Sequence, residues 1–482
     1  MPDIANIASA KKANIFCLLV AIVITLVLPL RKEIWYDETV SILCSKGISH
    51  ETPAQFANAT AINSATLNDL NTPKNVFNAT VVDNGNGFLY NIGLHWFTGL
   101  FGNTLTIYTL FTQACGIVAL IAFFALCTLL FGNSIFTALA ILLFAADNVF
   151  MGMAHEIRGY TMGVAFVILA AIYFYKFTYQ NPRPFHLFLT GMFSVAAILS
   201  HFLSVYVILV FLAAILYAQR GRLLSWRNIG ALILPICILG AFFYFAYSGL
   251  QTMGMQNHEI QAKNMNAGFN LPEVFFRSLK FTDLNFKAMF PAFVDNKVVY
   301  VISFLFVIAL YLFAVKATAD KVKKRNLQLL LLLGGSGTLF LAFLSIKSGH
   351  YTALYFRYYS FCIPFSCLFM AYTMYVVCNS PSINQFIKAA IPAFIIVPTL
   401  LFFVLANRVR PDVQYNHHQV ATEILRDNVT RMGVPRWRDA FLVQAFLPGR
   451  YKIDYELNPN DPNFTLYKTN TVEKIPVIKG DL

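Results

Sequence analysis

Two adjacent carboxylates, Asp37 and Glu38, are the residues of this sequence best suited to chemistry. They lie in the segment LRKEIWYDET, which directly follows the first long apolar run and holds five charges within eight positions. A carboxylate in such a place can act as a general base that accepts the proton of a hydroxyl group. A solvated helix end accounts for the same charges, so the segment alone leaves a catalytic and a purely structural interpretation open.

Further polar residues recur where later apolar runs end. The candidates for substrate contacts are His155, Glu156, Arg158, Tyr160, His201, Lys347, His350, Arg357 and, from an aromatic segment, Tyr90 and His95. Each has a plain structural explanation, because a basic side chain at a helix end can reach toward lipid headgroups. Together, however, these residue types suit group transfer from a lipid-linked phosphate. A carboxylate activates the incoming hydroxyl, and guanidinium groups stabilise the phosphate that leaves.

The composition shows which elements must position these residues. The chain is 57% apolar and only 12% charged, and its mean hydropathy is +0.60. A membrane-spanning helix needs about 20 apolar residues, and the sequence offers about eleven such segments. They lie near residues 14–30, 106–130, 134–150, 160–178, 186–200, 202–218, 228–248, 298–316, 328–346, 358–378 and 388–406. The sequence therefore predicts an all-α polytopic membrane protein.

The distribution of Lys and Arg predicts the orientation. With the N-terminus in the cytoplasm, the basic residues of the short loops fall inside, as the positive-inside rule requires. They are Lys11, Lys12, Lys176, Arg183, Arg220, Arg222, Arg227, Lys316, Lys321, Lys323, Lys324 and Arg325. Residues 1–13 lack a signal cleavage site, so the first span is expected to be a retained anchor. We expect an integral protein of a bacterial inner (plasma) membrane with an extracytoplasmic C-terminus.

This topology divides the chain into two parts. Residues 1–406 form a membrane module whose large outer loops are 31–105, 249–297 and 347–357, and residues 407–482 form a small extracytoplasmic α/β domain. In that tail, helical spacing at 420–425 predicts a helix, and the run 440–445 predicts a strand. Thr39 to Leu43 is expected to be a short amphipathic element lying along the surface.

Several classes of function are disfavoured. The net charge of +13 is explained by the basic inner loops, and no basic and aromatic pattern suggests a nucleic-acid partner. Most of the eight cysteines lie inside apolar runs, so neither a disulfide framework nor a CxxC metal site is predicted.

Five motifs, in order, resemble those of the GT-C membrane glycosyltransferases, especially the family 39-like group with the protein O-mannosyltransferases and the lipid A aminoarabinose transferase. They are WYDET (35–39), FLYNIGLHWFTGLFG (88–102), HEIRGYTM (155–162), SHFLSVY (200–206) and FRYYSFCIPF (356–365). The chain departs from the group at Asn84-Gly85-Asn86-Gly87, where a Pro-Pro pair is common. Residues 249–297 match nothing in the group, and they are expected to help cover the site or to bind acceptor.

The resemblance implies a GT-C type fold and a polyprenyl-phosphate-linked sugar donor, used outside the cytoplasm with inversion at the anomeric carbon. The acceptor is a lipid, glycan or protein, and membrane lipids surround the module. Asp37 is the expected base, and Glu38 orients it or helps to bind a divalent ion. Neighbouring helical residues point about 100° apart, so these two carboxylates are not expected to act identically. Metal use varies across the superfamily, so the resemblance leaves the cofactor open.

Two other classes remain open. A transporter or flippase of lipid-linked saccharides also has many spans, although it usually carries ionisable groups or broken helices near the membrane midplane. A non-catalytic subunit of cell-envelope assembly has the same topology and does not need the carboxylates.

Overall fold

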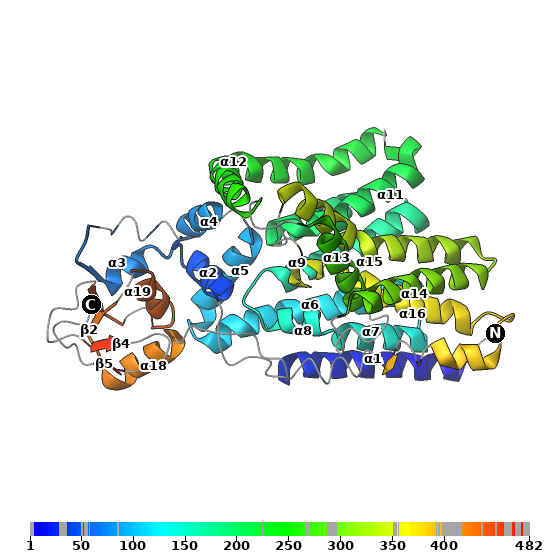
Figure 1. Ribbon diagram of the computed structural model, residues 1–482, viewed down its shortest axis with the longest axis horizontal. Coiled ribbons are helices and arrows are strands. Elements are labelled where there is room, and N and C mark those ends of the chain that lie inside the picture. The colour runs from blue at the N-terminus through cyan, green and yellow to red at the C-terminus, as the bar shows by residue number, and fades with distance from the viewer. Residues whose placement is uncertain are drawn as a thin grey trace.

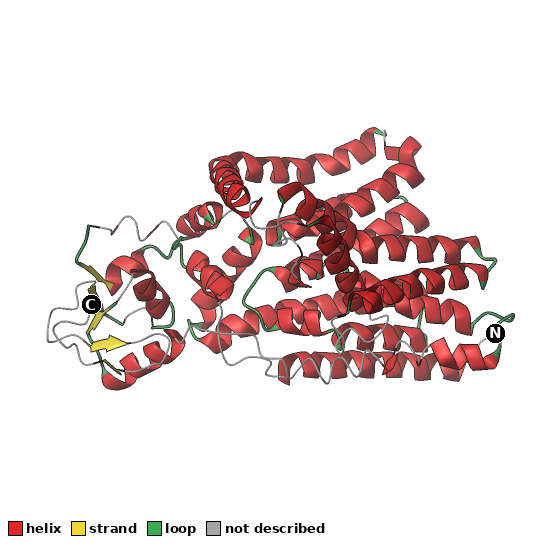
Figure 2. Cartoon of the chain, in the orientation of Figure 1, coloured by secondary structure: helices red, strands yellow, loops and turns green. Residues whose placement is uncertain are grey.

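The computed structural model describes the chain in segments separated by gaps. These are residues 4–27, 36–49, 52, 56, 58–83, 86–223, 225–265, 270–286, 296–349, 354, 356–391, 393, 396–397, 417–434, 437–448, 451–456, 465–467 and 474–475. Most of the described chain is helical (Figure 2). A long helical bundle carries a small mixed unit at the end opposite the N-terminus (Figure 1).

The bundle is built from the apolar runs of the sequence. Its helices are α1 (Ile4–Val27), α6 (Leu105–Phe131), α7 (Ile135–Ala145), α8 (Asn148–Ala154), α9 (Tyr160–Tyr175), α10 (Pro184–Ser200), α11 (Val205–Leu223), α12 (Trp226–Met265), α14 (Lys297–Lys316), α15 (Lys321–Ser348) and α16 (Ile363–Cys378). Local signals set their ends. In α15, the Asp320 side chain caps the first backbone N–H groups, and Gly349 ends the helix in the left-handed conformation.

The structure confirms the polytopic helical fold. In its described residues, seven helices are long and apolar enough to cross a membrane, and one bent pair and two shorter apolar helices bring the matches to ten of the predicted segments. The remaining segment, 388–406, lies mostly outside the described residues. As predicted, the region 186–218 is two helices, because the chain breaks at His201 into the 3₁₀ turn Phe202–Ser204.

The segment predicted as one span at 134–150 is bent. Helices α7 and α8 meet at an angle of 63°, and Asp147 lies between them with 1% of its surface exposed. Its Oδ1 accepts a hydrogen bond of 2.9 Å from the Phe150 N–H, so Asp147 is the N-cap of α8. The bend directs α8 toward the turn that carries Glu156.

Residues 249–297, expected as an outer loop, contain the end of α12 and helix α13 (Leu271–Phe286). Helix α13 packs against α14, α15 and α16. Its Thr282 hydroxyl lies 3.0 Å from that of Thr338, and a Cβ on Gly334 would lie 2.9 Å from the Phe286 ring. Because Gly334 lies midway along α15, the end of α13 reaches into the bundle.

The mixed unit combines two distant parts of the chain. Its elements are α2 (Tyr36–Ser45), β1 (Ala61–Asn63), α3 (Ser64–Asp69), α4 (Pro73–Val82), α5 (Phe88–Phe101), α18 (His417–Asp427), β2 (Arg431–Gly433), α19 (Trp437–Gln444), β3 (Asp454–Glu456), β4 (Thr465–Tyr467) and β5 (Lys474–Ile475). The sheet order is β1-β3-β2-β4-β5. Strand β1 pairs antiparallel with β3, and Ile62 lies opposite Tyr455.

Two local predictions for this unit are wrong. Residues 440–445 form most of helix α19 and its end, not a strand, because a short apolar run suits a buried helix as well as a strand, and here it packs on α18 and α2. The 39–43 element is helical, but Ile42 and Leu43 are buried under the tail, in a shared core with Phe441. It therefore does not lie along a surface.

Candidate active site

The first turn of α2 places Asp37 beside Arg357. The Asp37 Oδ2 lies 3.1 Å from the Arg357 Nη2, and the other arm of the guanidinium reaches Glu156, with 3.5 Å between Nη1 and Oε1. The side chains of Arg357 and Glu156 are 10% and 5% exposed, whereas that of Asp37 is 27% exposed. One buried cation thus links two carboxylates, and Asp37 is the accessible one.

The turn between α8 and α9 supplies the second guanidinium. The Arg158 Nη1 donates hydrogen bonds to the Asp37 carbonyl oxygen, at 3.1 Å, and to the Ser41 hydroxyl, at 3.2 Å. Gly159 lets this turn approach the end of α10, since a Cβ there would lie 2.3 Å from the Ser200 carbonyl oxygen. Arg158 therefore anchors its turn to α2 and holds it beside the Asp37–Arg357 pair.

Glu38 is directed away from this pair. Its Oε1 accepts a hydrogen bond of 2.9 Å from the Ile157 N–H, and Glu38 is 2% exposed. The two neighbouring carboxylates therefore differ in environment, as the 100° angle between adjacent helical positions predicts. The structure places Glu38 as a clamp between α2 and the 155–159 turn.

The electrostatics of the two arginines favour their charged forms. Burial opposes the charge of Arg158, but Tyr160, Asp37, Asp83 and Glu156 raise its pKa above the ordinary value. Burial is also the largest single influence on Arg357 and lowers its pKa. Its neighbours, chiefly Tyr160, Glu156 and Asp37, together outweigh burial and raise the pKa above the ordinary value. Both guanidinium groups stay protonated at every physiological pH, so the site holds two fixed positive charges.

His201 lies against this cluster from the turn between α10 and α11. Its ring stacks on Tyr160, with 4.4 Å between centroids, and it is 3% exposed. Burial, followed by the charges of Arg158 and Arg357, holds the pKa of His201 well below its ordinary value. His201 is therefore neutral at physiological pH.

The structure brings Asp37, Glu156, Arg158, Tyr160, His201 and Arg357 together, and it separates the other predicted residues from them. The Tyr90 hydroxyl lies 2.6 Å from that of Thr112 in the core behind Glu38. His155 is buried, with Nδ1 3.3 Å from the Gln113 Nε2. Lys347 is exposed at the end of α15, and His350 lies outside the described residues.

His95 lies at the opposite end of α2. Its Nδ1 contacts the Ser45 carbonyl oxygen, at 3.1 Å, and the Asn71 Oδ1, at 3.2 Å. Beside it, the buried Lys46 ammonium donates to the Asn103 side chain. These residues form a second polar cluster, the Lys46–His95 cluster, one helix length from Asp37.

Sequence reasoning missed three residues of the site. Ser41 accepts from Arg158, Asp83 acts on the charge of Arg158, and Asn86 contacts the His201 turn. One signal was available for Ser41, since it lies one helical turn after Asp37 and so shares its face. The Asn-Gly-Asn-Gly departure from the resembled motif marked the Asn86 position.

The described residues do not suit a divalent ion. Among them, no group of three or more His, Cys, Asp or Glu residues is arranged to hold a metal. The Arg357 guanidinium occupies the position between Asp37 and Glu156 that a bridging cation would need.

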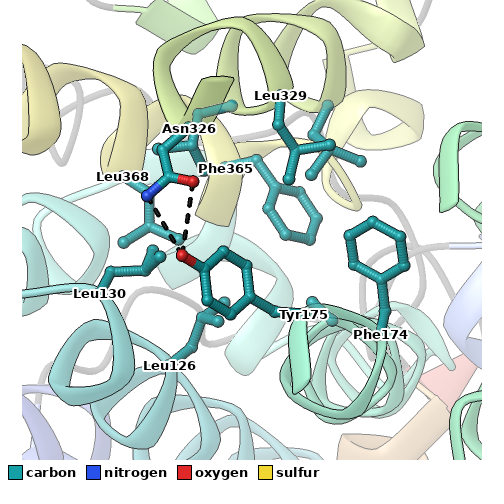
Figure 3. A pocket seen from close by; sticks show the side chains of 11 residues that line it. Leu126, Leu130, Phe174, Tyr175, Asn326, Leu329, Phe365 and Leu368 are labelled. Atoms are coloured by element: carbon teal, nitrogen blue, oxygen red, sulfur yellow. Dashed lines mark hydrogen bonds between the residues drawn. The ribbon is translucent and has the colours of Figure 1, made fainter. Parts of the chain in front are cut away.

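A small cavity lies elsewhere in the bundle, between α6, α9, α15 and α16. Figure 3 shows Asn326 above Tyr175 among apolar side chains. The Asn326 Nδ2 donates to the Tyr175 hydroxyl, at 3.2 Å, and to that of Tyr372, at 3.0 Å. The cavity of about 20 Å³ has room for about one water molecule. Asn326 lies near the start of α15, and Arg357 follows its end, so the cavity is not part of the site.

No family model and no curated protein sequence matches this chain. Among solved structures, it is similar to the archaeal oligosaccharyltransferase AglB from Archaeoglobus fulgidus, in complex with an inhibitory peptide and a dolichol-phosphate. The identity is 12%, the TM-score is 0.42, and the match covers 94% of this chain and 62% of AglB. The chain thus spans less than two thirds of the length of AglB.

It is also similar to ArnT from Cupriavidus metallidurans. The apo structure matches at 11% identity and a TM-score of 0.36, and the structure bound to undecaprenyl phosphate at 12% and 0.39. Each match covers 90% of this chain and 84% of ArnT. AglB and ArnT are GT-C superfamily members, the family that the five motifs resemble.

Proposed function

We propose that this chain is a membrane glycosyltransferase that moves a sugar from a polyprenyl-phosphate-linked donor to an acceptor hydroxyl at the extracytoplasmic face. The observation that carries the proposal is the pair formed by Asp37 and Arg357. An accessible carboxylate lies 3.1 Å from a buried guanidinium, which places a proton acceptor next to a fixed positive charge. An inverting transfer from a phosphate needs both groups.

In the proposed step, Asp37 accepts the proton of the acceptor hydroxyl as the hydroxyl oxygen forms a bond to the anomeric carbon. The bond between that carbon and the phosphate oxygen breaks, and its electron pair stays on the polyprenyl phosphate. The leaving phosphate gains negative charge, which Arg357 and Arg158 stabilise. As the base of this step, Asp37 acts as a carboxylate, with the Arg357 Nη2 3.1 Å from its Oδ2.

Buried contacts support this division of roles. Glu156 is 5% exposed and shares Arg357 with Asp37, so it fixes the guanidinium on the buried side of the pair. Arg158 is fixed by the Asp37 carbonyl and by Ser41. Rigid support of this kind is what charge stabilisation in a transition state requires, because the groups need not reorganise as the charge develops.

The test compares Asp37→Asn with Glu38→Gln in purified protein supplied with labelled polyprenyl-phosphate sugars and candidate acceptors. We expect Asp37→Asn to lower the transfer rate about 10²–10⁴-fold, the range of general base catalysis. Glu38→Gln removes a neighbouring charge but leaves an oxygen that can accept from the Ile157 N–H, so it should retain most of the rate. Equal rates for wild type and Asp37→Asn would remove Asp37 as the base.

A flippase for lipid-linked saccharides is the second candidate, and one observation favours it. The buried Asp147 lies at the 63° break between α7 and α8, and broken helices with buried carboxylates are typical of transporters. If wild type transfers no sugar but moves a fluorescent lipid-linked saccharide across proteoliposomes, and Asp147→Asn abolishes that movement, the flippase replaces the glycosyltransferase.

A further inference from the structure

The end of the bundle opposite the candidate active site is strongly basic. Residues 316–325, which join α14 to α15, hold five cations and one carboxylate. The carboxylate is Asp320, whose Oδ1 accepts hydrogen bonds from the Val322 N–H, at 2.8 Å, and from the Lys323 N–H, at 3.4 Å. It thus caps α15, and within the described chain no ion pair neutralises the five cations. A surface with this charge attracts anions.

Arg325 stands out among these cations. Its guanidinium lies over the Tyr179 ring, with 3.9 Å between the Cζ and the ring centroid, which is a cation–π contact. The side chain is half-buried, and its Nε is enclosed without a hydrogen-bond partner. Among the described residues, no acceptor serves the other guanidinium donors either. A planar fork of donors fits the paired oxygens of a phosphate or carboxylate.

The residue after Arg325 fixes its position on the bundle. Asn326 is buried, and its Nδ2 donates to the Tyr175 hydroxyl, at 3.2 Å (Figure 3), and to the Tyr372 hydroxyl, at 3.0 Å. These tyrosines belong to α9 and α16. The first turn of α15 is therefore held from two sides, and Arg325 has a defined orientation.

The tyrosine under Arg325 is fixed as well. Tyr179 lies in the π-helical turn Lys176–Gln180, which follows α9, and such turns are frequent at functional sites. The Gln219 Nε2 of α11 donates to the Thr178 carbonyl oxygen at 2.7 Å, so this turn is anchored to a third helix. Both halves of the stacked pair are thus held in place before any ligand binds, which lowers the entropic cost of binding.

The pair lies at the ends of two apolar spans. The span Tyr160–Gln180 ends directly after Tyr179, and the span Lys321–Ser348 begins one helical turn before Arg325. Aromatic and basic side chains at the ends of spans lie at the depth of the lipid headgroups. Arg325 is therefore at the depth where the phosphates of membrane lipids lie.

An apolar stripe on α15 begins at Arg325. Leu332, Leu339 and Ile346 follow it at intervals of seven residues, and they are 57%, 71% and 51% exposed. Side chains seven residues apart lie on one face of a helix. The face that carries the guanidinium thus continues along the helix as exposed hydrocarbon, which suits an acyl chain and gives no advantage to a free phosphate ion.

We infer that Arg325 and Tyr179 form a binding site for an anionic phospholipid. The guanidinium binds the lipid phosphate, and an acyl chain lies along the exposed stripe of α15. The charges of Lys323 and Lys324 nearby favour a headgroup with a net negative charge over a zwitterionic one. This site lies at the other end of α15 from Arg357, and it does not depend on sugar transfer.

The experiment measures lipid binding to the purified full-length protein by native mass spectrometry. Delipidated protein in detergent is titrated with phosphatidylglycerol or with phosphatidylcholine of the same acyl chains, which carries a phosphate but no net charge. We expect wild type to bind one phosphatidylglycerol at least about tenfold more tightly than phosphatidylcholine. Arg325→Ala should weaken phosphatidylglycerol binding about 10²-fold, the loss of two charge-assisted hydrogen bonds.

Lys321→Ala is the matched control. It removes the same charge from an exposed position one turn earlier on α15, so a diffuse basic surface and a defined site give different results. At a defined site, Lys321→Ala should weaken phosphatidylglycerol binding no more than about fivefold, the effect of one charge near an anionic surface.

Two variants of Tyr179 test the site with every charge kept. Tyr179→Phe retains an aromatic face under the guanidinium and should bind phosphatidylglycerol as wild type does. Tyr179→Leu removes that face and should bind about threefold to tenfold more weakly. This comparison decides the question even if Arg325→Ala does not fold, which its thermal unfolding in phosphatidylcholine nanodiscs reveals.

Four results would overturn the inference. Wild type could show no preference for phosphatidylglycerol, or Arg325→Ala and Lys321→Ala could weaken binding equally. The two Tyr179 variants could bind alike, or inorganic phosphate at the same free concentration could displace the lipid, which would make this a site for soluble anions. None of these measurements needs a sugar donor, so the site stands or falls separately from the glycosyltransferase proposal.

Discussion

The two ends of α2 handle buried charge in opposite ways. At the first turn, Asp37 and Glu156 share the Arg357 guanidinium. Just after the last turn, the hydrogen-bond partner of Lys46 among the described residues is the neutral Asn103 side chain, and His95 contacts a carbonyl and an amide oxygen. Both ends carry residue types that chemistry can use, but within the described chain the opposite charges are paired at the first end.

As a consequence, the basic side chains at the two ends of α2 have pKa values shifted in opposite directions. Nearby anions raise the pKa values of Arg357 and Arg158 in spite of burial. Burial lowers the pKa of Lys46 to about 8, and burial is also the main cause of the lowered pKa of His95. One end holds fixed charges for binding an anion, and the other is close to losing its charge. The presence of a paired charge, more than residue type, separates a candidate site from a structural cluster.

Removing Arg357 should have the largest effect on this contrast. Arg357→Ala leaves Asp37 and Glu156 facing each other without their shared cation, and breaking a buried pair costs about 3–5 kcal/mol of unfolding free energy. We expect it to lower the thermal unfolding temperature and to reduce sugar transfer at least about 10²-fold. Initial rates and thermal unfolding in nanodiscs measure the two effects.

Arg357→Lys separates charge from geometry. Lysine keeps the positive charge but cannot reach both carboxylates with two parallel donors. We expect most of the stability to return and the transfer rate to remain well below wild type. If Arg357→Ala is as stable and active as wild type, the ion pairs do not organise this end of α2.

The pH dependence of stability tests the other end. Unfolded Lys46 has a pKa of about 10.4, above its folded pKa of about 8. Between these values the unfolded chain binds more protons, so stability rises with pH. Below pH 8 the full penalty of about 3 kcal/mol is present. Lys46→Met removes that penalty and one hydrogen bond, so it should be more stable than wild type at pH 7 and lose that advantage by pH 10.

Lys347→Met is the matched control, because it makes the same chemical change at an exposed lysine. Its unfolding temperature relative to wild type should not vary between pH 7 and pH 10. If Lys46→Met behaves in the same way as this control, the ammonium of Lys46 is not held in a buried environment, and the contrast between the two ends of α2 is lost.

The sequence was most informative where one physical rule dominates. Apolar length alone locates the spans, and the ends of apolar runs carry Asp37, Glu156, Arg158, His201 and Arg357, which the fold brings to one place. Contacts between distant parts of the chain could not be predicted from the sequence. Strand β1 pairs with β3, and the Ser64 N–H donates to the Ile453 carbonyl at 2.8 Å, nearly the whole chain away.

Within the site, the sequence identified the residue types but not their partners. Nothing in the order Asp37-Glu38 tells which carboxylate meets Arg357, since that depends on the rotation of α2 under the tail. The contact of Asn86 with the Phe202 N–H could not be predicted from the sequence, because it depends on the backbone of the His201 turn. His95 was placed in the site by its motif, whereas the fold carries it to the far end of α2.

The smallest expected effect is that of replacing His95. This variant tests whether His95 contacts substrate, as its motif predicts, or lies too far from Asp37 to do so, as the fold indicates. In His95→Gln, the side-chain amide can donate to the Ser45 carbonyl in place of the ring, so the unfolding free energy should change by no more than about 1 kcal/mol. Because Asp37 and Arg357 lie at the other end of the helix, the transfer rate should change less than about twofold. A loss of tenfold or more, with stability unchanged, would mean that substrate reaches His95. The substrate-binding region would then extend along the whole length of α2, and the Lys46–His95 cluster would belong to it.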